Sequence, residues 1–590
     1  MNRVAKVRAI IACFGLACCF TGFSARLVYL QVNQFDAYTR LAAQKHIKKQ
    51  PIYARRGAIQ DVRGEMLADN EPLETVVADE SLITEPAKIA AAIADLVKMK
   101  PAELQKKITT PPGEKPRKYE VLAKEVAESD VTEMKKRLER QKLKGIYFEQ
   151  DSRRIYPNGE MLCHVVGFMN GDHTGIQGIE MTMDRYLHGE DGFRYTERDR
   201  TGKEIVPYRG QERPARNGYN VRLTVDMGLQ NIVETELDAV FNQYRPEMAT
   251  AIMMDPKTGR ILAMANRPCF NPNELTKGET AGMKNCAIIN MVEPGSTFKI
   301  VTAAAALNDK LVTPDTIIPC ENGRFSYAGK VLKDHGHGDH PDLSVADVLV
   351  KSSNIGAAKL GMKLGEQRFY EYIRSFGFGE RTGISLPGEI AGIVHPPHKW
   401  SKISITRLPM GQGVGVTPLQ MVCAMSAIAN GGKLMLPQIV DSIVDDKGTP
   451  LVTYPPEMIR EVVTSETTEK VKSALKDVVS KRGTAFAAAV PGFSVGGKTG
   501  TAQKPDAHGG YYETRYVTSF IGFMPVEDPQ FVCLVMVDDA KASETQNYGG
   551  TIAAPVFSRI GEKAARYMNL QPDMELNPPS PSIKLTKSDR

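Results

Sequence analysis

Three short motifs in the C-terminal half of the chain carry side chains capable of nucleophilic chemistry. In the first, EPGSTFK at residues 293–299, Ser296 and Lys299 stand three residues apart at the start of an apolar, alanine-rich segment. At this spacing two side chains share one face of a helix. A serine hydroxyl needs a base within hydrogen-bond reach, and lysine can be that base when burial and a nearby cation keep its amine neutral. The motif therefore predicts Ser296 as a nucleophile and Lys299 as its base.

The second motif, KSSN at residues 351–354, follows a segment, 342–350, that we expect to be helical. Ser352 and Asn354 lie two residues apart in a predicted turn, so both side chains can point into one cleft. The tripeptide is not specific by itself, because Ser and Asn are common in turns. Its meaning depends on the motifs around it.

The third motif, VGGKTGTA at residues 495–502, places Lys498 in a predicted strand, followed by Thr499, Gly500 and Thr501. Small residues in a strand allow another backbone to approach closely, as happens when a peptide substrate adds to a sheet edge. The segment PGFSVGGKT also matches a phosphate loop formally. We reject a nucleotide site because no apolar helix follows Lys498.

The motifs lie in residues 246–568, which have the pattern of a domain that mixes strands and helices. Four strand-like runs form two predicted hairpins, at residues 250–254, 260–264, 517–524 and 531–537. Helical segments lie between these hairpins and at residues 553–567. Strands at both ends that enclose helices predict an α+β fold, with one antiparallel sheet flanked by helices. The polar, proline-rich residues 569–590 predict a disordered tail.

Residues 31–245 predict a mixed α/β pedestal domain without a catalytic constellation. Residues 86–107 and 117–143 have helical periodicity and many Lys and Glu residues, which is typical of solvated helix faces. Residues 222–225 alternate like a strand, and Asp226 after them is placed to cap a helix.

Residues 9–30 predict one transmembrane anchor. The run from Ala9 to Ala25 carries no charge, and LVYL continues it past Arg26, which approaches the ~20 apolar residues that a spanning helix needs. Residues 1–8 contain basic but no acidic side chains, so the positive-inside rule predicts a cytoplasmic tail and an exported body. A cleaved signal peptide, or a lipoprotein at one of the adjacent cysteines, is the alternative, although the cleavage-site residues match poorly.

Composition excludes several classes of function. The chain has 590 residues, enough for two or three domains. Its 75 basic and 69 acidic residues leave a net charge of +6, too weak to indicate nucleic acid as the main ligand. Nine scattered cysteines exclude a disulfide scaffold; we expect free thiols, and one disulfide remains open. HGHGDH at residues 335–340 has zinc-type side chains, but its glycines predict a floppy loop, so we predict no metal site.

Ser-x-x-Lys, Ser-x-Asn and Lys-Thr-Gly in this order are the motif set of penicillin-binding proteins and β-lactamases. Further matching segments are RGAIQD, RRIYPNG, HVVGF, GIQGIE, LTVDMGLQ, DPKTGRILAMANRPCFNPN, FGFGERTGISLPGE, MGQGVGVTPLQM and GGTIAAPVF. With them the chain resembles a class B penicillin-binding protein from the anchor to about residue 560. FGFGERTGISLPGE and TPLQM resemble the division-specific, FtsI-like branch more than the elongation branch, and a spore-cortex relative would look much the same.

The resemblance implies a serine β-lactamase/transpeptidase-like domain behind a dimerisation-like pedestal. It implies a peptidoglycan D,D-transpeptidase that needs no cofactor, crosslinks stem peptides in the septal wall and is acylated by β-lactams. The D-Ala-D-Ala donor would lie beside Lys498–Thr501, Ser296 would form the acyl-enzyme, and Ser352, Asn354 and Lys498 would assist. The body would be periplasmic on a single-pass inner (plasma) membrane anchor, in contact with a SEDS-type glycan polymerase and other divisome proteins.

Several rival functions fit the sequence less well. A β-lactamase needs an added Glu that activates water, and no Glu-x-x-Leu-Asn lies between Ser352 and Lys498. A bifunctional synthase needs a glycosyltransferase acid cluster, which EDGFRY at residues 190–195 does not supply. A non-catalytic penicillin-binding scaffold or sensor would tolerate the loss of Lys498, which is present. A D,D-carboxypeptidase, which uses water as the acceptor, remains open, as does an elongation- or spore-specific role.

Overall fold

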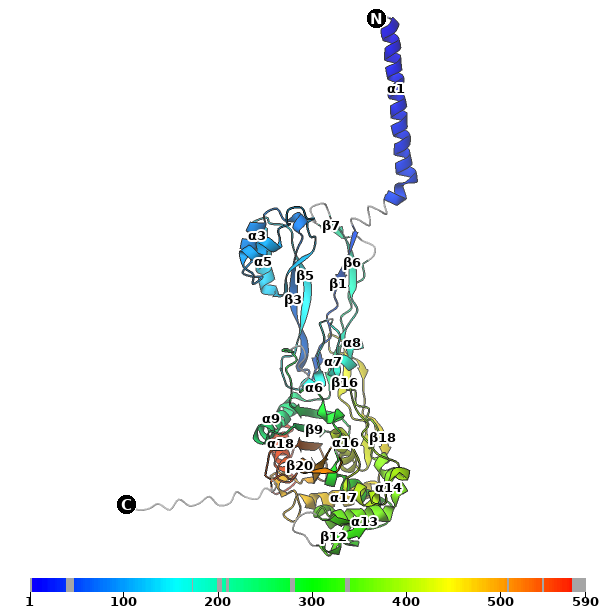
Figure 1. The fold of residues 1–590 in the computed structure, drawn as a ribbon, viewed down its shortest axis with the longest axis vertical. Coiled ribbons are helices and arrows are strands. Elements are labelled where there is room, and N and C mark those ends of the chain that lie inside the picture. Colours follow the sequence, from blue (N-terminus) through cyan, green and yellow to red (C-terminus); the bar gives the residue numbers. More distant parts are fainter. Residues whose placement is uncertain are drawn as a thin grey trace, which may run out of the picture. The chain divides into compact units, whose positions relative to one another are not determined.

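The computed structural model describes residues 3–38, 47–171, 173–198, 204–207, 212–275, 282–334, 340–506, 509–543 and 546–575 (Figure 1). The chain forms two structural units, each built from separate stretches of sequence. The first contains Met1–Arg56, Asn70–Arg153 and Gly189–Gly218. The second contains Gly57–Asp69, Arg154–His188 and Tyr219–Arg590, and it carries all three motifs.

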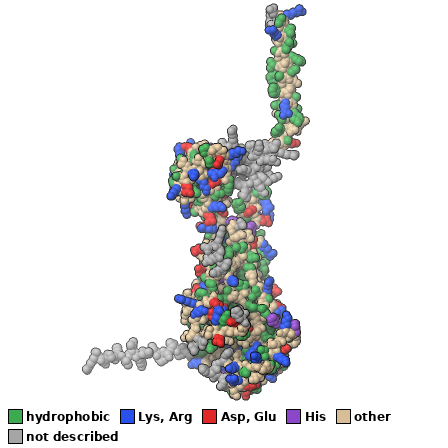
Figure 2. Space-filling view, viewed as in Figure 1, with side chains coloured by type: hydrophobic (Ala, Val, Ile, Leu, Met, Phe, Trp, Pro, Cys, Tyr) green, Lys and Arg blue, Asp and Glu red, His purple; other side chains and the backbone are tan. Residues whose placement is uncertain are grey.

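Helix α1 (Arg3–Val28) continues into a π-helical turn, Tyr29–Asn33. The 28 residues Lys6–Asn33 are long and apolar enough to cross a membrane, and none of them is buried. Figure 2 shows apolar side chains along the surface of this helix. At about 1.5 Å per residue the stretch exceeds the ~30 Å of a bilayer core. The predicted single apolar helix is confirmed, and the described residues contain no other of this kind.

The rest of the first unit packs three helices on a small sheet. Strand β3 (Met66–Ala78), which begins in the second unit, pairs with β4 (Glu120–Ala127) and β5 (Ile146–Ile155). The helices are α3 (Pro86–Ile93), α4 (Pro101–Lys107) and α5 (Glu128–Arg140). A separate three-stranded sheet contains β1 (Ile47–Ile52), β6 (Gly192–Arg198) and β7 (Glu204–Pro207).

One helix prediction in this unit is wrong over part of its length. Residues 117–143 were predicted to be helical, but Glu120–Ala127 form strand β4, which pairs antiparallel with β3. The free edge of β3 offers these residues hydrogen bonds that outweigh their weak helical preference. Residues 86–107 contain two helices, α3 and α4, as the pattern predicts in part; residues 94–100 between them are a turn, and Pro101 starts α4.

The centre of the second unit is an antiparallel sheet in the order β10-β9-β21-β20-β19. Its strands are β9 (Met248–Met254), β10 (Ile261–Arg267), β19 (Gly496–Pro505), β20 (Tyr511–Met524) and β21 (Phe531–Asp538). Both predicted hairpins are confirmed, and pairing of β9 with β21 joins them in one sheet. The predicted α+β fold is therefore confirmed, with β19 at an edge.

Helices cover both faces of this sheet (Figure 1). Helices α9 (Met227–Tyr244) and α18 (Ala553–Tyr567) pack together on one face, and α16 (Pro418–Ala429) packs on the other. Every residue of β9 is buried, as expected for a strand covered on both faces. Asp226 caps α9 by accepting hydrogen bonds from its first turn, as predicted.

The remaining elements of the second unit carry or support the motifs. The other helices are α6 (Cys163–Val166), α7 (Gly178–Thr182), α8 (Asp184–Leu187), α10 (Cys286–Ile289), α11 (Lys299–Asn308), α12 (Val345–Val350), α13 (Asn354–Leu364), α14 (Glu366–Ser375), α15 (Ser404–Arg407) and α17 (Ser465–Val478). One sheet has the order β17-β16-β8-β2-β3, in which the start of β3 pairs with β2, and its first four strands are Pro450–Thr453, Val440–Val444, Asn220–Leu223 and Ile59–Gln60. Three strand pairs are β11 (Ile317–Pro319) with β14 (Asp342–Ser344), β12 (Arg324–Tyr327) with β13 (Lys330–Lys333), and β15 (Lys433–Met435) with β18 (Met458–Glu461).

The helix predicted for residues 342–350 starts later than expected. Asp342–Ser344 form strand β14, and helix α12 begins at Val345. The Ser344 hydroxyl accepts a hydrogen bond from the backbone N–H of Asp347, which makes Ser344 the N-cap rather than a helical residue.

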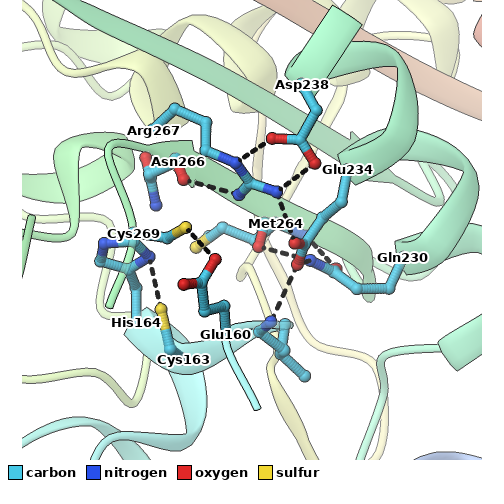
Figure 3. Close-up of polar contacts among 11 residues, drawn as sticks. Glu160, Cys163, His164, Gln230, Glu234, Asp238, Met264, Asn266, Arg267 and Cys269 are labelled. Atoms are coloured by element: carbon cyan, nitrogen blue, oxygen red, sulfur yellow. Dashed lines mark hydrogen bonds and ion pairs between the residues drawn. The ribbon is translucent and has the colours of Figure 1, made fainter. Parts of the chain in front are cut away.

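A largely buried polar network joins helix α9 to strand β10 (Figure 3). Arg267, the last residue of β10, contacts the carboxylates of Glu234 at 2.8 Å and Asp238 at 2.5 Å. The Gln230 side chain exchanges two hydrogen bonds with the backbone of Met264, at 2.9 and 3.0 Å. Paired in this way, the guanidinium of Arg267 can lie in the interior without an uncompensated charge.

Candidate active site

The Ser296 motif begins the apolar helix that the sequence predicts. Residues Gly295–Phe298 form a 3-10 turn that runs directly into α11. The Phe298 ring packs on Phe369 and Phe378, with centroids 6.4 and 5.0 Å apart. Before Ser296, the backbone N–H of Gly295 donates to the carbonyl of Gly411 at 3.2 Å. The chain is thus fixed on both sides of Ser296.

Lys299 is buried, with 1% of its surface exposed. Its Nζ lies 2.5 Å from the carbonyl oxygen of Ser352, 3.3 Å from Ser352 Oγ and 2.8 Å from Asn354 Oδ1. Burial, and then the charge of Lys498, hold its pKa well below the ordinary value, whereas Asp334 acts in the opposite direction. A lowered pKa favours the neutral amine, which is the form that a general base requires.

Ser352 adopts a left-handed backbone conformation, with φ +58°. For a residue with a side chain this costs about 1–2 kcal/mol, and such strain clusters at functional sites. The turn directs the carbonyl of Ser352 to Lys299 and its hydroxyl to Lys498. Ser353 then caps helix α13 by accepting from the N–H of Gly356 at 2.9 Å, which places Asn354 at the first position of that helix.

Lys498 lies on the edge strand β19 and is fully buried. Its Nζ is 2.9 Å from Ser352 Oγ, and burial lowers its pKa to about 7. Thr499 and Thr501 follow on the same strand, and the Thr501 hydroxyl accepts a hydrogen bond from the N–H of Gly549 at 3.1 Å. A Cβ at Gly500 would lie only 2.4 Å from Ser519 Oγ, so glycine is needed there.

The structure brings four of the predicted residues together from three elements: Lys299, Ser352, Asn354 and Lys498. The Ser352 hydroxyl lies between two buried amines, Lys299 and Lys498, and Asn354 contacts the first of them. Within the described part of the chain, no hydrogen bond of the Ser296 hydroxyl is seen. Such bonds often tighten only when substrate is present. The Ser296 side chain is partly exposed and lies three residues before Lys299, whose lowered pKa favours the neutral amine.

Sequence reasoning missed Asp334, which lies 20 residues before Asn354. Its carboxylate contacts Ser353, Asn354 and the next residue of α13. No local pattern signals this contact, because it joins the end of strand β13 to a helix that is distant in the sequence.

The described residues contain no group of three or more His, Cys, Asp or Glu side chains arranged to hold a metal ion. The HGHGD part of the predicted zinc-type segment, residues 335–339, lies outside the described residues. The nine cysteines are free thiols. Lys498 continues along strand β19 rather than into a helix, which is not the geometry of a phosphate loop.

Residues 249–562 match the family model of the penicillin-binding protein transpeptidase domain, and residues 51–223 match that of the penicillin-binding protein dimerisation domain. The chain is 35% identical over 563 residues to stage V sporulation protein D of Bacillus subtilis, covering 94% of this chain and 84% of that protein. It is 30% identical over 574 residues to peptidoglycan D,D-transpeptidase FtsI of Escherichia coli, covering 96% and 92%.

Solved structures agree with these matches. Penicillin-binding protein 2X from Streptococcus thermophilus is similar with a TM-score of 0.77 and 26% identity, covering 88% of this chain and 80% of that one. Penicillin-binding protein 3 from Mycobacterium tuberculosis, complexed with aztreonam, is similar with a TM-score of 0.68 and 28% identity, covering 90% and 99%.

Proposed function

The chain belongs to the class B penicillin-binding proteins, serine-type peptidoglycan D,D-transpeptidases that bind β-lactams, and we propose that Ser296 is its nucleophile and Lys299 its general base. The observation that carries this assignment is the position of Lys299. Two acceptors, the Ser352 carbonyl and Asn354 Oδ1, lie within 2.5 and 2.8 Å of its Nζ. A neutral amine has two N–H groups to satisfy them, which leaves its lone pair for the proton of Ser296.

The donor peptide would bind along the outer edge of β19. This strand ends the five-stranded sheet, so its outer backbone groups can pair with an added strand. A protonated Lys498 and the hydroxyls of Thr499 and Thr501 would hold the donor's terminal carboxylate. Gly500 would let the donor backbone approach.

In the first chemical step, Ser296 Oγ attacks the penultimate carbonyl carbon of the D-Ala-D-Ala donor while Lys299 takes its proton. The backbone N–H groups of Ser296 and Thr501 would stabilise the oxyanion, a type of interaction typically worth ~3 kcal/mol per donor. The C–N bond to the terminal D-Ala then breaks. The proton passes through Ser352 to the leaving amine, which departs as free D-Ala.

In the second step, an amine of a neighbouring stem peptide attacks the acyl-enzyme carbonyl. Its proton returns through Lys299 to Ser296 as the ester bond breaks. One new amide bond, the crosslink, replaces the amide bond that was broken, so no cofactor or energy source is required.

Lys299→Met tests the assignment of the base. Methionine has similar length and polarizable bulk but no amine, so the rate of acylation by a penicillin should fall by about 10²–10⁴-fold, the usual contribution of general base catalysis. Lys363→Met removes an exposed amine from helix α13 and is the matched control. Equal rates for Lys299→Met and the control would refute the assignment.

Product analysis tests the acceptor. A pentapeptide donor mixed with a stem-peptide acceptor should give crosslinked dimer together with free D-Ala. Free D-Ala with trimmed tetrapeptide alone would indicate that water is the acceptor, as in a carboxypeptidase.

For the cellular role, we propose crosslinking of septal wall in cell division, with a cytoplasmic N-terminus, an extracytoplasmic body, and a SEDS-type polymerase and divisome proteins as partners. The basic residues Arg3, Lys6 and Arg8, in α1 before its uncharged run, support this orientation. A sporulation role is the second candidate, favoured by 35% identity to stage V sporulation protein D. A fluorescent fusion that marks the division site of growing cells would support the first role. A fusion confined to sporulating cells would support the second.

A further inference from the structure

Asp334, directly after strand β13, holds the turn that carries Ser352. Its Oδ1 accepts hydrogen bonds from the backbone N–H of Asn354 at 2.5 Å and of Ile355 at 3.0 Å. Its Oδ2 accepts from the hydroxyl of Ser353 at 2.8 Å. The carbonyl of the preceding residue, Lys333, accepts from Nδ2 of Asn354 at 3.0 Å. These bonds orient both the backbone and the side chain of Asn354, whose Oδ1 contacts Lys299.

Asp334 also supplies negative charge to a site that has two buried amines. Lys299 and Lys498 are 1% and 0% exposed, and Asp334 is the carboxylate that acts electrostatically on Lys299 in the part of the chain that the structure describes. Buried charges need such compensation.

The other charged and titratable groups near Asp334 do not replace it. Cys320 is one of them, and the other charged groups that act on Cys320 together with Asp334 are Asp342 on β14 and Lys359 on α13. The Lys359 ammonium contacts the carboxylate of Glu321 at 2.5 Å, which compensates its charge. Asp342 is exposed to solvent, which screens its effect.

We infer that Asp334 is a positioning residue of the transpeptidase reaction, which holds the turn of Ser352 and Asn354 in place for Lys299 and provides a negative charge that acts on that lysine. The inference rests on the proposed roles of these residues. It assigns part of the site's geometry and electrostatics to the β12–β13 hairpin, which contributes no group to the chemistry itself.

Asp334→Asn separates the effect of the negative charge from the effect of the side chain's size and hydrogen bonds. The amide oxygen can still accept from the N–H groups of Asn354 and Ile355, but the charge is gone, and charge-assisted hydrogen bonds are roughly twice as strong as neutral ones. We expect acylation to slow about tenfold. Asp334→Ala removes the acceptor as well, and we expect a loss of about a hundredfold, the effect of a small misplacement of catalytic groups.

The pH profile distinguishes positioning with charge from simple support of the fold. Acylation is lost as pH falls and Lys299 becomes protonated. Removing the negative charge of Asp334 lowers the pKa of Lys299 further, so the acid-side midpoint should move to lower pH. A purely structural residue would change the rate but not the midpoint.

The experiment uses the full-length chain in detergent and measures acylation by a penicillin across the pH range. The variants are Asp334→Asn, Asp334→Ala and the matched control Asp342→Asn, with thermal melting as the check on folding. A slower Asp334→Asn with its midpoint at lower pH, and an unchanged Asp342→Asn, is the expected result. A wild-type rate, or a slow rate with an unmoved midpoint, in Asp334→Asn would overturn the inference. Absence of acylation in the wild type would instead overturn the proposed function.

Discussion

Replacing Gly411 by Ala should disable acylation, because this glycine lies against the backbone that precedes Ser296. A Cβ on Gly411 would lie 2.2 Å from the carbonyl oxygen and 2.7 Å from the nitrogen of Gly295. Backbone atoms cannot rotate away as a long side chain can. To reach ordinary contact at 3.4 Å, the Gly295 carbonyl must retreat by about 1.2 Å, and Ser296 follows directly after it.

Gly413 in the same loop provides a matched control. Gly411 and Gly413 have φ values of +83° and +78°, so an alanine at either position carries the same left-handed penalty of about 1–2 kcal/mol. A Cβ on Gly413, however, would meet only the Leu408 side chain at 3.9 Å, which is ordinary contact. The two variants therefore differ in the contact with Gly295.

A displacement of about 1 Å at a reacting group can cost about a hundredfold in rate. We expect the second-order rate constant for acylation by a penicillin to fall about a hundredfold in Gly411→Ala. It should stay within about threefold of wild type in Gly413→Ala, as for substitutions away from close contacts. Thermal melting of both variants checks that each is folded. Equal acylation rates in two folded variants would refute the argument that this backbone contact positions Ser296.

Three further predictions concern titration, stability and metals. Acylation should slow as pH falls through the lowered pKa of Lys299, because protonation removes the base; a constant rate from about pH 5 to 9 would contradict its role. Glu180→Ala should lower the free energy of unfolding by about 3–5 kcal/mol, because it removes the carboxylate that Arg154, which is buried, contacts at 2.7 Å and that compensates its charge. By comparison, Glu71→Ala at the exposed pair with Arg153 should cost less than about 1 kcal/mol in urea unfolding, and equal losses would contradict the argument. Dialysis against a chelator should leave the acylation rate unchanged. If the untreated protein contains zinc and acylation is lost after dialysis, the reaction depends on a metal and the prediction is wrong.

Much of the fold could be predicted because the signals are local. The hairpin of β9 and β10 has apolar runs around a Pro-Gly turn, and helix α18 spans the predicted 553–567. Prediction failed where a segment's secondary structure depends on a partner that is distant in the sequence. Residues 120–127 have helical periodicity, yet they form β4 because β3 offers an edge to pair with. The start of α12 was misplaced because Ser344 acts as a cap, which periodicity alone does not reveal.

The site shows the same division. Ser296 and Lys299 could be paired from their spacing, and Lys498 could be placed on a strand because Val495 and Thr499 favour one. Lys299 and Lys498 both contact the Ser352 hydroxyl only because the chain folds back on itself. The sequence shows the order of the motifs but not this contact. The strained φ of Ser352 and the contacts of Asp334 leave no sequence signal, since both depend on how α13 meets β13.

Intact mass spectrometry of the protein mixed with a penicillin tests the central claim most directly. Wild type should gain the mass of one penicillin and keep it for hours, since a transpeptidase acyl-enzyme hydrolyses slowly, while Ser296→Ala should gain nothing. A transient adduct with drug turnover would contradict the account and indicate a hydrolase. A stable adduct on Ser296→Ala would refute the assignment of Ser296, because another residue would then be the nucleophile.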